Sequence, residues 1–406
     1  MADASPDALS TGAPPGRPGI AQPLLAGFVA ALIGFAGTFA LVLAGLRAVG
    51  ASESQASSGL MVLTVSMGLL SIALSLHHRM PITSAWSTPG AALLIAGGAV
   101  SGGYPAAIGA FLLAGVLIVI AGLWGPLERL IESIPAPIAS AMLAGVLLPV
   151  CLTPVHALVG HPWLAGPPIL VWALLTRFAR RWAAPGALLA TAIAIVIDDA
   201  PTIGSSALPH LAFTAPAFDV GTLVGLGLPL FIVTMASQNI TGMSVLATFG
   251  YRPRLGPLLV STGATSIVGA PFGGHAVNLA AISAALTAGP DADPDPSRRW
   301  IAAVGWGLTC LVQGLGAGLA TALVATAPPV VIESVAGLAL LASLAAATRT
   351  ALADETWREP AMITFVVSAS AVTIWGIGAP FWGLLAGLGF GALHHRRRAP
   401  VELGDR

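Results

Sequence analysis

The chain has 406 residues, of which 56% are hydrophobic and only 8% are charged, and its mean hydropathy is +0.88. Because a soluble domain carries about 25% charged residues, this composition excludes an ordinary soluble protein and predicts a polytopic membrane protein. The 17 basic residues balance 17 acidic ones, so no overall field would attract nucleic acid, and we expect no nucleic-acid partner.

Residues 1–22 are rich in Ala, Pro, Gly and Ser. They lack the basic segment and short apolar core of a signal peptide, so we expect a disordered cytoplasmic tail. Residues 396–406 are expected to form a second cytoplasmic tail. Cys151 and Cys310 lie in apolar runs without CxxC spacing, which is typical of small buried hydrophobic residues. We therefore predict no metal site and no cofactor.

Apolar runs of the length needed to cross a bilayer predict about fourteen transmembrane spans. They cover residues 23–46, 55–76, 82–99, 104–125, 135–158, 163–179, 183–198, 219–240, 256–270, 273–288, 299–326, 329–350, 360–378 and 380–395. With the N-terminus in the cytoplasm, all of the arginines except Arg47 fall on the cytoplasmic side. Because cytoplasmic loops are enriched in arginine, this distribution supports the number of spans and predicts that both termini are cytoplasmic.

Two of these spans begin with residues that disfavour a regular helix. The third reads PITSAWSTPG over 81–90 and is expected to become helical at about Ala91, and the tenth reads GAPFGGH over 269–275 and is expected to be helical from Ala276 to Leu286. Proline suits the first turn of a helix, and paired glycines let the backbone approach a ligand. Because the tenth span lies seven positions after the third, we predict an inverted repeat of seven plus seven spans, with these half-helices facing each other.

Polar side chains gather near both half-helices. Ser237, Gln238 and Asn239 end the eighth span, whereas His275 and Asn278 lie in the tenth, with Asn278 expected one turn into its helix. Hydrogen-bonding groups at membrane depth are costly unless they line a cavity or bind a ligand, so we expect a substrate site. The alternatives are that Gln238 and Asn239 only bond neighbouring helices and that His275 only bonds a carbonyl group.

Three stretches resemble the benzoate/proton symporter family (BenE), which is related to the nucleobase and sulfate transporters with a seven plus seven inverted repeat. They are SQNITGMSVLATFGYRP (237–253), APFGGHAVNLAAISAA (270–285) and GPDADPDPSRRW (289–300). The resemblance extends over about residues 20–395. It implies an all-α secondary active transporter of a bacterial inner membrane, which imports benzoate or a similar aromatic carboxylate with protons by an elevator-like movement.

The resemblance also implies two domains. A core domain of spans 1–4 and 8–11 is expected within residues 23–158 and 219–326, and a gate domain of spans 5–7 and 12–14 is expected within residues 135–200 and 329–395. The core would move against the gate. Whether two copies pair through the gate domain stays open.

Nucleobase carriers of this fold place carboxylates on the eighth and tenth spans. Here the matching positions fall near Ser237 or Gln238 and near Val277 or Asn278, so the site holds no fixed anion. Two helix N-termini would then attract an anionic substrate. The predicted substrate-binding residues are Ser84, Trp86, Ser87, Thr88, Ser237, Gln238, Asn239, Phe272, Gly273, Gly274, His275 and Asn278. Trp86 and Phe272 either flank an aromatic ring or only pack between helices.

Proton coupling is expected because importing one negative charge against about 100 mV costs roughly 2.3 kcal/mol. His275 is the candidate proton carrier, since imidazole changes charge near neutral pH. Alternatively, the substrate carboxylate carries the proton itself. The chain shows no nucleophile with a base and no metal cluster, so an enzyme is not predicted. A carrier for another organic anion or a neutral aromatic compound, and an anion channel, remain alternatives.

Polar residues outside the site are expected to be interfacial. Asp291, Asp293, Asp295, Arg298 and Arg299 are predicted to form a solvated cytoplasmic turn in which Ser297 caps the next helix. A set of four histidines lies beside arginines at cytoplasmic ends without acids at metal-ligand spacing, namely His77, His78, His394 and His395.

Overall fold

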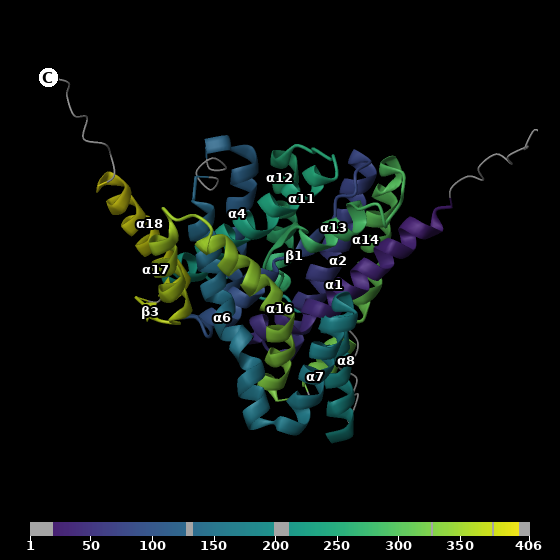
Figure 1. Cartoon of the computed structure of the whole chain (residues 1–406), viewed down its shortest axis with the longest axis horizontal. Coiled ribbons are helices and arrows are strands. Elements are labelled where there is room, and N and C mark those ends of the chain that lie inside the picture. Colours follow the sequence, from purple (N-terminus) through teal and green to yellow (C-terminus); the bar gives the residue numbers. More distant parts are fainter. Residues whose placement is uncertain (1–18, 127–132, 199–210, 326–327, 376, 398–406) are drawn as a thin grey trace, which may run out of the picture.

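The apolar runs of the sequence form helices that pack around two short strands at the centre of the molecule (Figure 1). This computed structural model describes residues 19–126, 133–198, 211–325, 328–375 and 377–397. Residues 1–18 and 398–406 of the two predicted tails lie outside the described residues. At both ends the helices extend into the predicted tails, because the first helix begins at Ala21 and the last continues to Arg397.

The first half of the chain contains one strand and seven α-helices among its described residues. In order they are α1 (Ala21–Ala48), α2 (Glu53–His78), β1 (Ser84–Trp86), α3 (Thr88–Gly97), α4 (Gly103–Leu123), α6 (Ala136–Gly160), α7 (Pro162–Phe178), the 3-10 turn η1 (Arg180–Trp182) and α8 (Ala183–Asp198).

The second half begins with one continuous helical stretch that includes two π-helical turns. It consists of α9 (Val220–Thr222), η3 (Leu223–Gly227), α10 (Leu228–Thr234), η4 (Met235–Asn239) and α11 (Ile240–Thr248). After it come α12 (Leu255–Gly269), η5 (Ala270–Phe272), β2 (Val277–Leu279), α13 (Ile282–Ala288), η6 (Pro296–Arg298), α14 (Trp300–Leu315), α15 (Ala317–Ala325), α16 (Pro329–Leu352), α17 (Arg358–Ala369), β3 (Thr373–Ile374), β4 (Ile377–Gly378) and α18 (Ala379–Arg397).

Seven of the described helical stretches are long and apolar enough to cross a membrane. They are Ala21–Ala48, Glu53–His78, Gly103–Leu123, Ala136–Gly160, Val220–Thr248, Leu255–Phe272 and Val330–Leu352. The other predicted spans contain helices that are shorter or interrupted, such as α3 and α13. The chain is therefore a multi-pass helical membrane protein, and the number of fourteen spans stays a prediction.

The packing of the helices repeats between the two halves of the chain. The fourth predicted span packs on the ninth (α4 on α12), and the second packs on the eleventh (α2 on α14). Likewise α7 pairs with α8, as α17 pairs with α18, and α6 packs on α16. When every span number is shifted by seven, the contact of spans 4 and 9 becomes that of spans 11 and 2, and the pair α7 and α8 becomes the pair α17 and α18. The contact of α6 with α16, which are spans 5 and 12, becomes itself. This correspondence is the pattern of an inverted repeat, as predicted.

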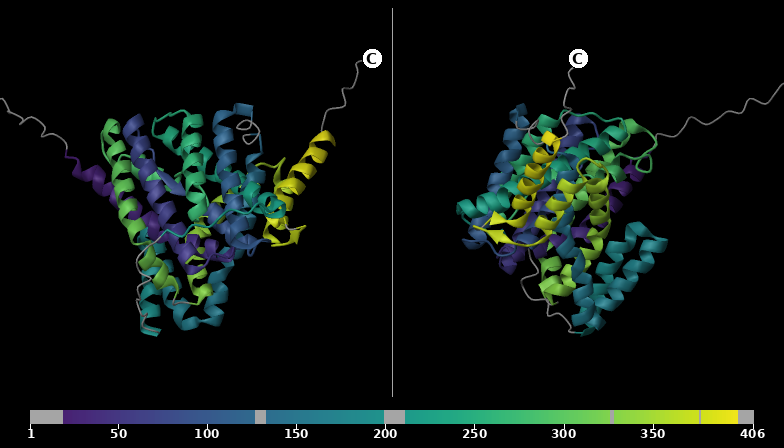
Figure 2. Two further views of the ribbon diagram at one scale, coloured as in Figure 1. Left: turned by 180° about the vertical axis from the view of Figure 1, so that it is seen from behind. Right: turned by 60° about the vertical axis from the view of Figure 1, so that its left-hand side comes forward.

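The first turn of α1 and the last turn of α18 lie on the same side of the molecule, the upper side in Figure 1. On the opposite side, α6, α7, α8 and α16 extend beyond the other helices, as two further views show (Figure 2). This arrangement agrees with an even number of crossings between the two ends of the described chain.

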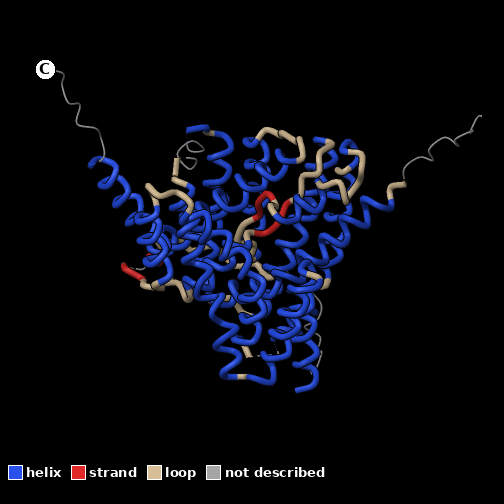
Figure 3. Tube along the Cα trace, in the orientation of Figure 1, coloured by secondary structure: helices blue, strands red, loops and turns tan. Residues whose placement is uncertain are grey.

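The two strands β1 and β2 pair in the middle of the helices (Figure 3). They are antiparallel, with Ser84 opposite Leu279, Ala85 opposite Asn278 and Trp86 opposite Val277. Strand pairing satisfies backbone N–H and C=O groups that would otherwise be costly in a medium without water. The third and tenth segments therefore do face each other, as the sequence predicted.

The predicted start of each half-helix was wrong by several residues. The α3 helix begins at Thr88, before Ala91, because the Ser87 hydroxyl accepts a hydrogen bond from the Gly90 N–H and caps the helix. The α13 helix begins only at Ile282, well after Ala276, because residues 277–279 are extended to pair with β1. Asn278 consequently lies on a strand and not on a helix.

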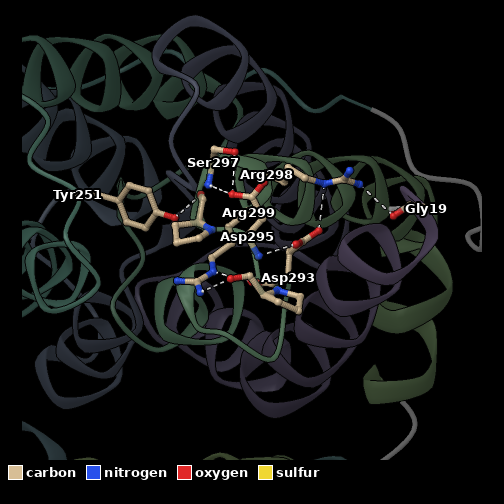
Figure 4. A network of polar contacts seen from close by, with 9 residues as sticks. Gly19, Tyr251, Asp293, Asp295, Ser297, Arg298 and Arg299 are labelled. Atoms are coloured by element: carbon tan, nitrogen blue, oxygen red, sulfur yellow. Dashed lines mark hydrogen bonds and ion pairs between the residues drawn. The ribbon is translucent and has the colours of Figure 1, made fainter. Parts of the chain in front are cut away.

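A network of polar contacts away from the strand pair fixes the loop between α13 and α14 (Figure 4). Arg299 is buried and donates to the carbonyl groups of Asp293 at 2.7 Å and of Ala288 at 2.9 Å. Ala288 is the last residue of α13, so the guanidinium group caps the negative end of that helix. Arg298 forms an ion pair with Asp293 and also donates to the Gly19 carbonyl beside α1.

The prediction of a solvated turn was wrong for Asp293 and Arg299, which are buried. It agrees with Asp291 and Asp295, which are exposed, whereas Arg298 is half-buried. The cap of η6 is Asp295 and not Ser297, because the carboxylate accepts hydrogen bonds from the hydroxyl and the N–H of Ser297. These bonds lower the pKa of Asp295. The Tyr251 hydroxyl group donates to the Pro296 carbonyl and joins the loop before α12 to the same network.

We expect Arg299→Ala to lower the free energy of unfolding by about 2 to 4 kcal/mol, because several buried carbonyl groups lose a charged donor. Arg349→Ala is the matched control, since Arg349 is exposed, and it should change stability by less than about 0.5 kcal/mol. Thermal unfolding in detergent would measure both variants. Equal stability of the two variants would contradict a structural role for Arg299.

Candidate functional site

Ser87 connects the third, eighth and tenth segments at the strand pair. Its N–H donates to the Ala276 carbonyl at 3.0 Å, and its carbonyl group lies 3.0 Å from Nε2 of His275. Its hydroxyl oxygen accepts from the Gly90 N–H and from the Thr234 hydroxyl. One residue thus starts α3 and holds it against the helix of span 8 and the loop before β2.

The tautomer of His275 follows from its partner. A carbonyl oxygen can only accept, so Nε2 carries the hydrogen in the bond to Ser87. In the neutral ring, Nδ1 is then a free acceptor, and this buried atom has no partner among the described residues. The ring also packs edge-on against Phe111 at a centroid distance of 6.2 Å. His275 is therefore both bonded to a carbonyl group and open to a proton or a donor at Nδ1.

The two asparagines hold the strands. Asn239, which is fully buried on η4, accepts a hydrogen bond from the Leu279 N–H at 2.9 Å. Asn278, in the orientation that satisfies both amide atoms, shares the Ser87 N–H with the Ala276 carbonyl, at 3.0 Å, and donates to the Leu279 carbonyl at 2.8 Å. Both side chains thus bond the backbone of the strand region. Asn239 therefore does more than join two neighbouring helices, because its partner Leu279 lies on β2.

Gln238 and Ser237 are different from Asn239. The Ser237 hydroxyl group donates to the Val233 carbonyl within the same helix. Gln238 is half-buried, and its amide has no hydrogen bond to any residue that the structure describes. All three residues lie in the π-helical turn η4, and turns of this kind are frequent at functional sites. Gln238 is therefore the polar residue of this cluster that has bonding capacity left for a ligand.

Serines inside two helices also position the strands, and the sequence prediction missed them. The Ser71 hydroxyl of α2 accepts from the Ser84 N–H at 2.8 Å, and the Ser266 hydroxyl of α12 accepts from the Val277 N–H at 2.8 Å. Spans 2 and 9 correspond in the inverted repeat, so the two halves use the same contact. A serine in the middle of each apolar span is the signal that could have indicated these residues.

The glycine pair before His275 is required by close packing. Gly273 has a φ of +96°, which side chains rarely permit, and an added methyl group would lie 2.6 Å from the Tyr104 hydroxyl oxygen. It would also lie 2.9 Å from Cα of Gly59 in α2. At Gly274, an added methyl group would lie 3.1 Å from the carbonyl carbon and the carbonyl oxygen of Gly269. These contacts explain both glycines by the fold, without a ligand.

The two predicted aromatic residues have different protein partners. Trp86 is buried, donates from Nε1 to the Thr38 hydroxyl at 3.1 Å and lies 5.7 Å from the Phe35 ring of α1. Phe272 is half-buried and packs edge-on against Phe213 at 5.8 Å. Both rings are therefore packing residues here, and contact with an aromatic substrate stays a prediction.

Several buried polar atoms around the strands have no partner among the residues described. They include the hydroxyl oxygens of Thr83 and Ser84 as well as Nδ1 of His275. Thr88, the first residue of α3, is half-buried. None of the twelve predicted site residues carries a carboxylate or a guanidinium group. The arrangement offers hydrogen bonds and the positive end of α3 to a ligand, without a fixed charge.

We expect Asn239→Ala to lower the free energy of unfolding by about 1 to 3 kcal/mol, because the buried Leu279 N–H loses its acceptor. Gln238→Ala is the adjacent control and should leave stability almost unchanged, since its amide bonds no described residue. Thermal unfolding without ligand would compare the variants. A loss of stability in Gln238→Ala equal to that in Asn239→Ala would show that both are structural.

Comparison with known proteins agrees with this architecture. Residues 20–393 match the family described as benzoate membrane transport protein (BenE). Inner membrane protein YdcO of Escherichia coli (strain K12) is 39% identical over 368 residues, which cover 90% of this chain and 93% of that protein. The benzoate membrane transport protein of Acinetobacter baylyi is 29% identical over 373 residues, with the same coverage of 90% and 93%.

The transmembrane domain of the cyanobacterium bicarbonate transporter BicA superposes with a TM-score of 0.55 at 16% identity, over 92% of this chain and 96% of that domain. This likeness shows a common fold, the inverted-repeat fold of anion transporters. The family match over almost the whole chain confirms the resemblance predicted from the three sequence stretches. The chain therefore belongs to the benzoate membrane transport protein family and is a membrane transport protein.

Proposed function

We propose that this chain imports benzoate or a similar aromatic carboxylate together with protons, as a secondary active transporter. The observation that carries the proposal is the uncharged strand pair, where α3 begins next to a histidine whose Nδ1 atom has no partner among the residues that the structure describes. The name of the Acinetobacter relative supports benzoate as the substrate.

A carboxylate suits the chemistry of this site. The start of a helix carries roughly half a positive charge, and α3 is the half-helix whose start lies at the strand pair. Because Pro89 has no N–H and the Gly90 N–H already bonds the Ser87 hydroxyl, the Thr88 N–H is the group of this first turn that is left for a ligand. The hydroxyl groups of Ser84 and Thr83 have unused capacity, and each buried polar group without a partner costs about 1 to 3 kcal/mol. A ligand, or water bound with it, would satisfy these groups.

The proton route that we propose passes through His275. Protonation at Nδ1 would keep the Nε2 bond to Ser87 and would place a positive charge beside the start of α3. That charge would strengthen the binding of a carboxylate, so substrate and proton would favour each other's binding. Because loading a proton with the anion cancels its charge, the membrane potential would no longer oppose import.

The movement that we propose is elevator-like, with the strand pair carried by a core of spans 1–4 and 8–11 against a gate of spans 5–7 and 12–14. The packing of α2 on α14 and of α4 on α12 supports a common body for the core. The contacts of α6 with α16 and α17 support one for the gate. The site elements α3 and η4 both contact α6, which supports a substrate site beside the gate.

Uptake into proteoliposomes tests this function. We expect saturable accumulation of labelled benzoate when the outside is acidic, and competition by substituted benzoates but not by benzamide, which has the same ring without a carboxylate. Competition by benzamide and benzoate alike would favour a carrier for neutral aromatic compounds. Flux without saturation and without exchange of labelled for unlabelled benzoate would indicate a channel.

We expect Gln238→Ala to raise the dissociation constant of benzoate about fivefold to a hundredfold, because one hydrogen bond to the ligand or its water would be lost. Binding to the purified protein by calorimetry would measure the change. Unchanged affinity in a variant of normal stability would remove Gln238 from the site.

We expect His275→Gln to abolish accumulation driven by a pH gradient while exchange of labelled for unlabelled benzoate continues. The glutamine amide can still donate to the Ser87 carbonyl, but it cannot take up a proton. His156→Gln is the matched control, since His156 is exposed on α6, and it should keep both activities. If His275→Gln still concentrates benzoate under a proton gradient, the proton travels on the substrate carboxylate.

A further inference from the structure

A groove of about 690 Å³ lies away from the strand pair, between the last turns of α2 and the start of α12. Its rim carries four basic side chains, Arg252, Arg254, His77 and His78, and its lining includes the apolar residues Leu74 and Met80. The lining contains no acidic residue. Because α2 and α12 come from different halves of the inverted repeat, the groove marks a seam between the two halves.

The arginines of this rim have no partners within the described part of the chain. Arg252 and Arg254 are exposed and make no hydrogen bond or ion pair with any residue in the described ranges. Two other loop arginines are engaged, since Arg298 pairs with Asp293 and Arg79 stacks on the Trp300 ring at 4.5 Å. The two unpaired guanidinium groups therefore give the groove a net positive charge that the protein does not neutralise.

The floor of the groove continues onto the apolar surface of α2. Leu69 and Leu76 are exposed on that helix to 55% and 46%, and α2 is one of the helices able to cross a membrane. A ligand in the groove would thus have cations at one end and hydrocarbon at the other. A small hydrophilic anion would use only the first of these features.

We propose that this groove binds one anionic diacyl phospholipid. Its phosphate group contacts Arg252 and Arg254, and an acyl chain lies over the apolar floor along α2. Basic pockets between membrane helices suit the head groups of anionic lipids, and guanidinium groups bond phosphate oxygens in pairs. The lipid would bridge α2 and α12 and so join the two halves at this side of the protein. The proposal does not depend on the transported substrate.

The test is native mass spectrometry of the purified full chain with phosphatidylglycerol and with phosphatidylcholine of the same acyl chains. We expect tighter retention of phosphatidylglycerol, and about 30-fold weaker retention in the double variant Arg252→Gln, Arg254→Gln. The control double variant Arg180→Gln, Arg349→Gln removes the same charge at exposed positions outside the groove and should retain the lipid as the unmodified protein does.

Two further measurements show whether the groove binds a whole lipid or only a phosphate group. Ala73→Phe fills the exposed apolar part of the groove without changing its charge, and it should also weaken phosphatidylglycerol retention. Glycerol phosphate at millimolar concentration should not displace the lipid. Equal retention by the groove variant and the control variant, or displacement by glycerol phosphate alone, would overturn the proposal, provided that thermal unfolding shows both variants to be folded.

Discussion

The structure depends on the backbone pairing of two short strands in the middle of its membrane helices. A membrane helix satisfies its own N–H and C=O groups, whereas the residues before α3 and α13 cannot, because they are extended. Each strand therefore bonds the other, and the remaining groups are taken by Ser71, Ser266 and Asn239. The polar side chains near the centre are thus needed first for the fold, and only a few atoms remain for a ligand.

This constraint separates what could be predicted from sequence and what could not. Hydrophobic run lengths predicted the helices, and the prolines and glycines of the third and tenth segments predicted that their helices would be interrupted. The start of α13 could not be predicted, since residues 276–281 have an ordinary helical composition and residues 277–279 are extended only because β1 lies opposite. Likewise, Arg299 reads as a solvated residue until the carbonyl groups around it are known.

The sequence predicted that the third, eighth and tenth segments lie together, as they do, but it could not predict which side chain bonds which partner. Asn239, Gln238 and Ser237 are neighbours of similar polarity, yet one bonds a strand, one has no described partner and one bonds its own helix. Consecutive residues of a helical turn point in different directions, and no residue pattern in the segment indicated which of the three would meet the strand. Assigning a binding role to a membrane-embedded amide therefore requires its backbone partners to be known.

The pairing of distant strands also has a consequence for synthesis in the cell. The Ser87 carbonyl accepts its bond from His275, which is made 188 residues later. At about 5 to 20 residues per second, the ribosome needs roughly 10 to 40 s to supply that partner. Throughout this interval the extended residues 84–86 have no opposite strand, and hydrocarbon cannot solvate them. The third segment must therefore stay shielded at the insertion machinery, or in a wetter position, until the second half arrives.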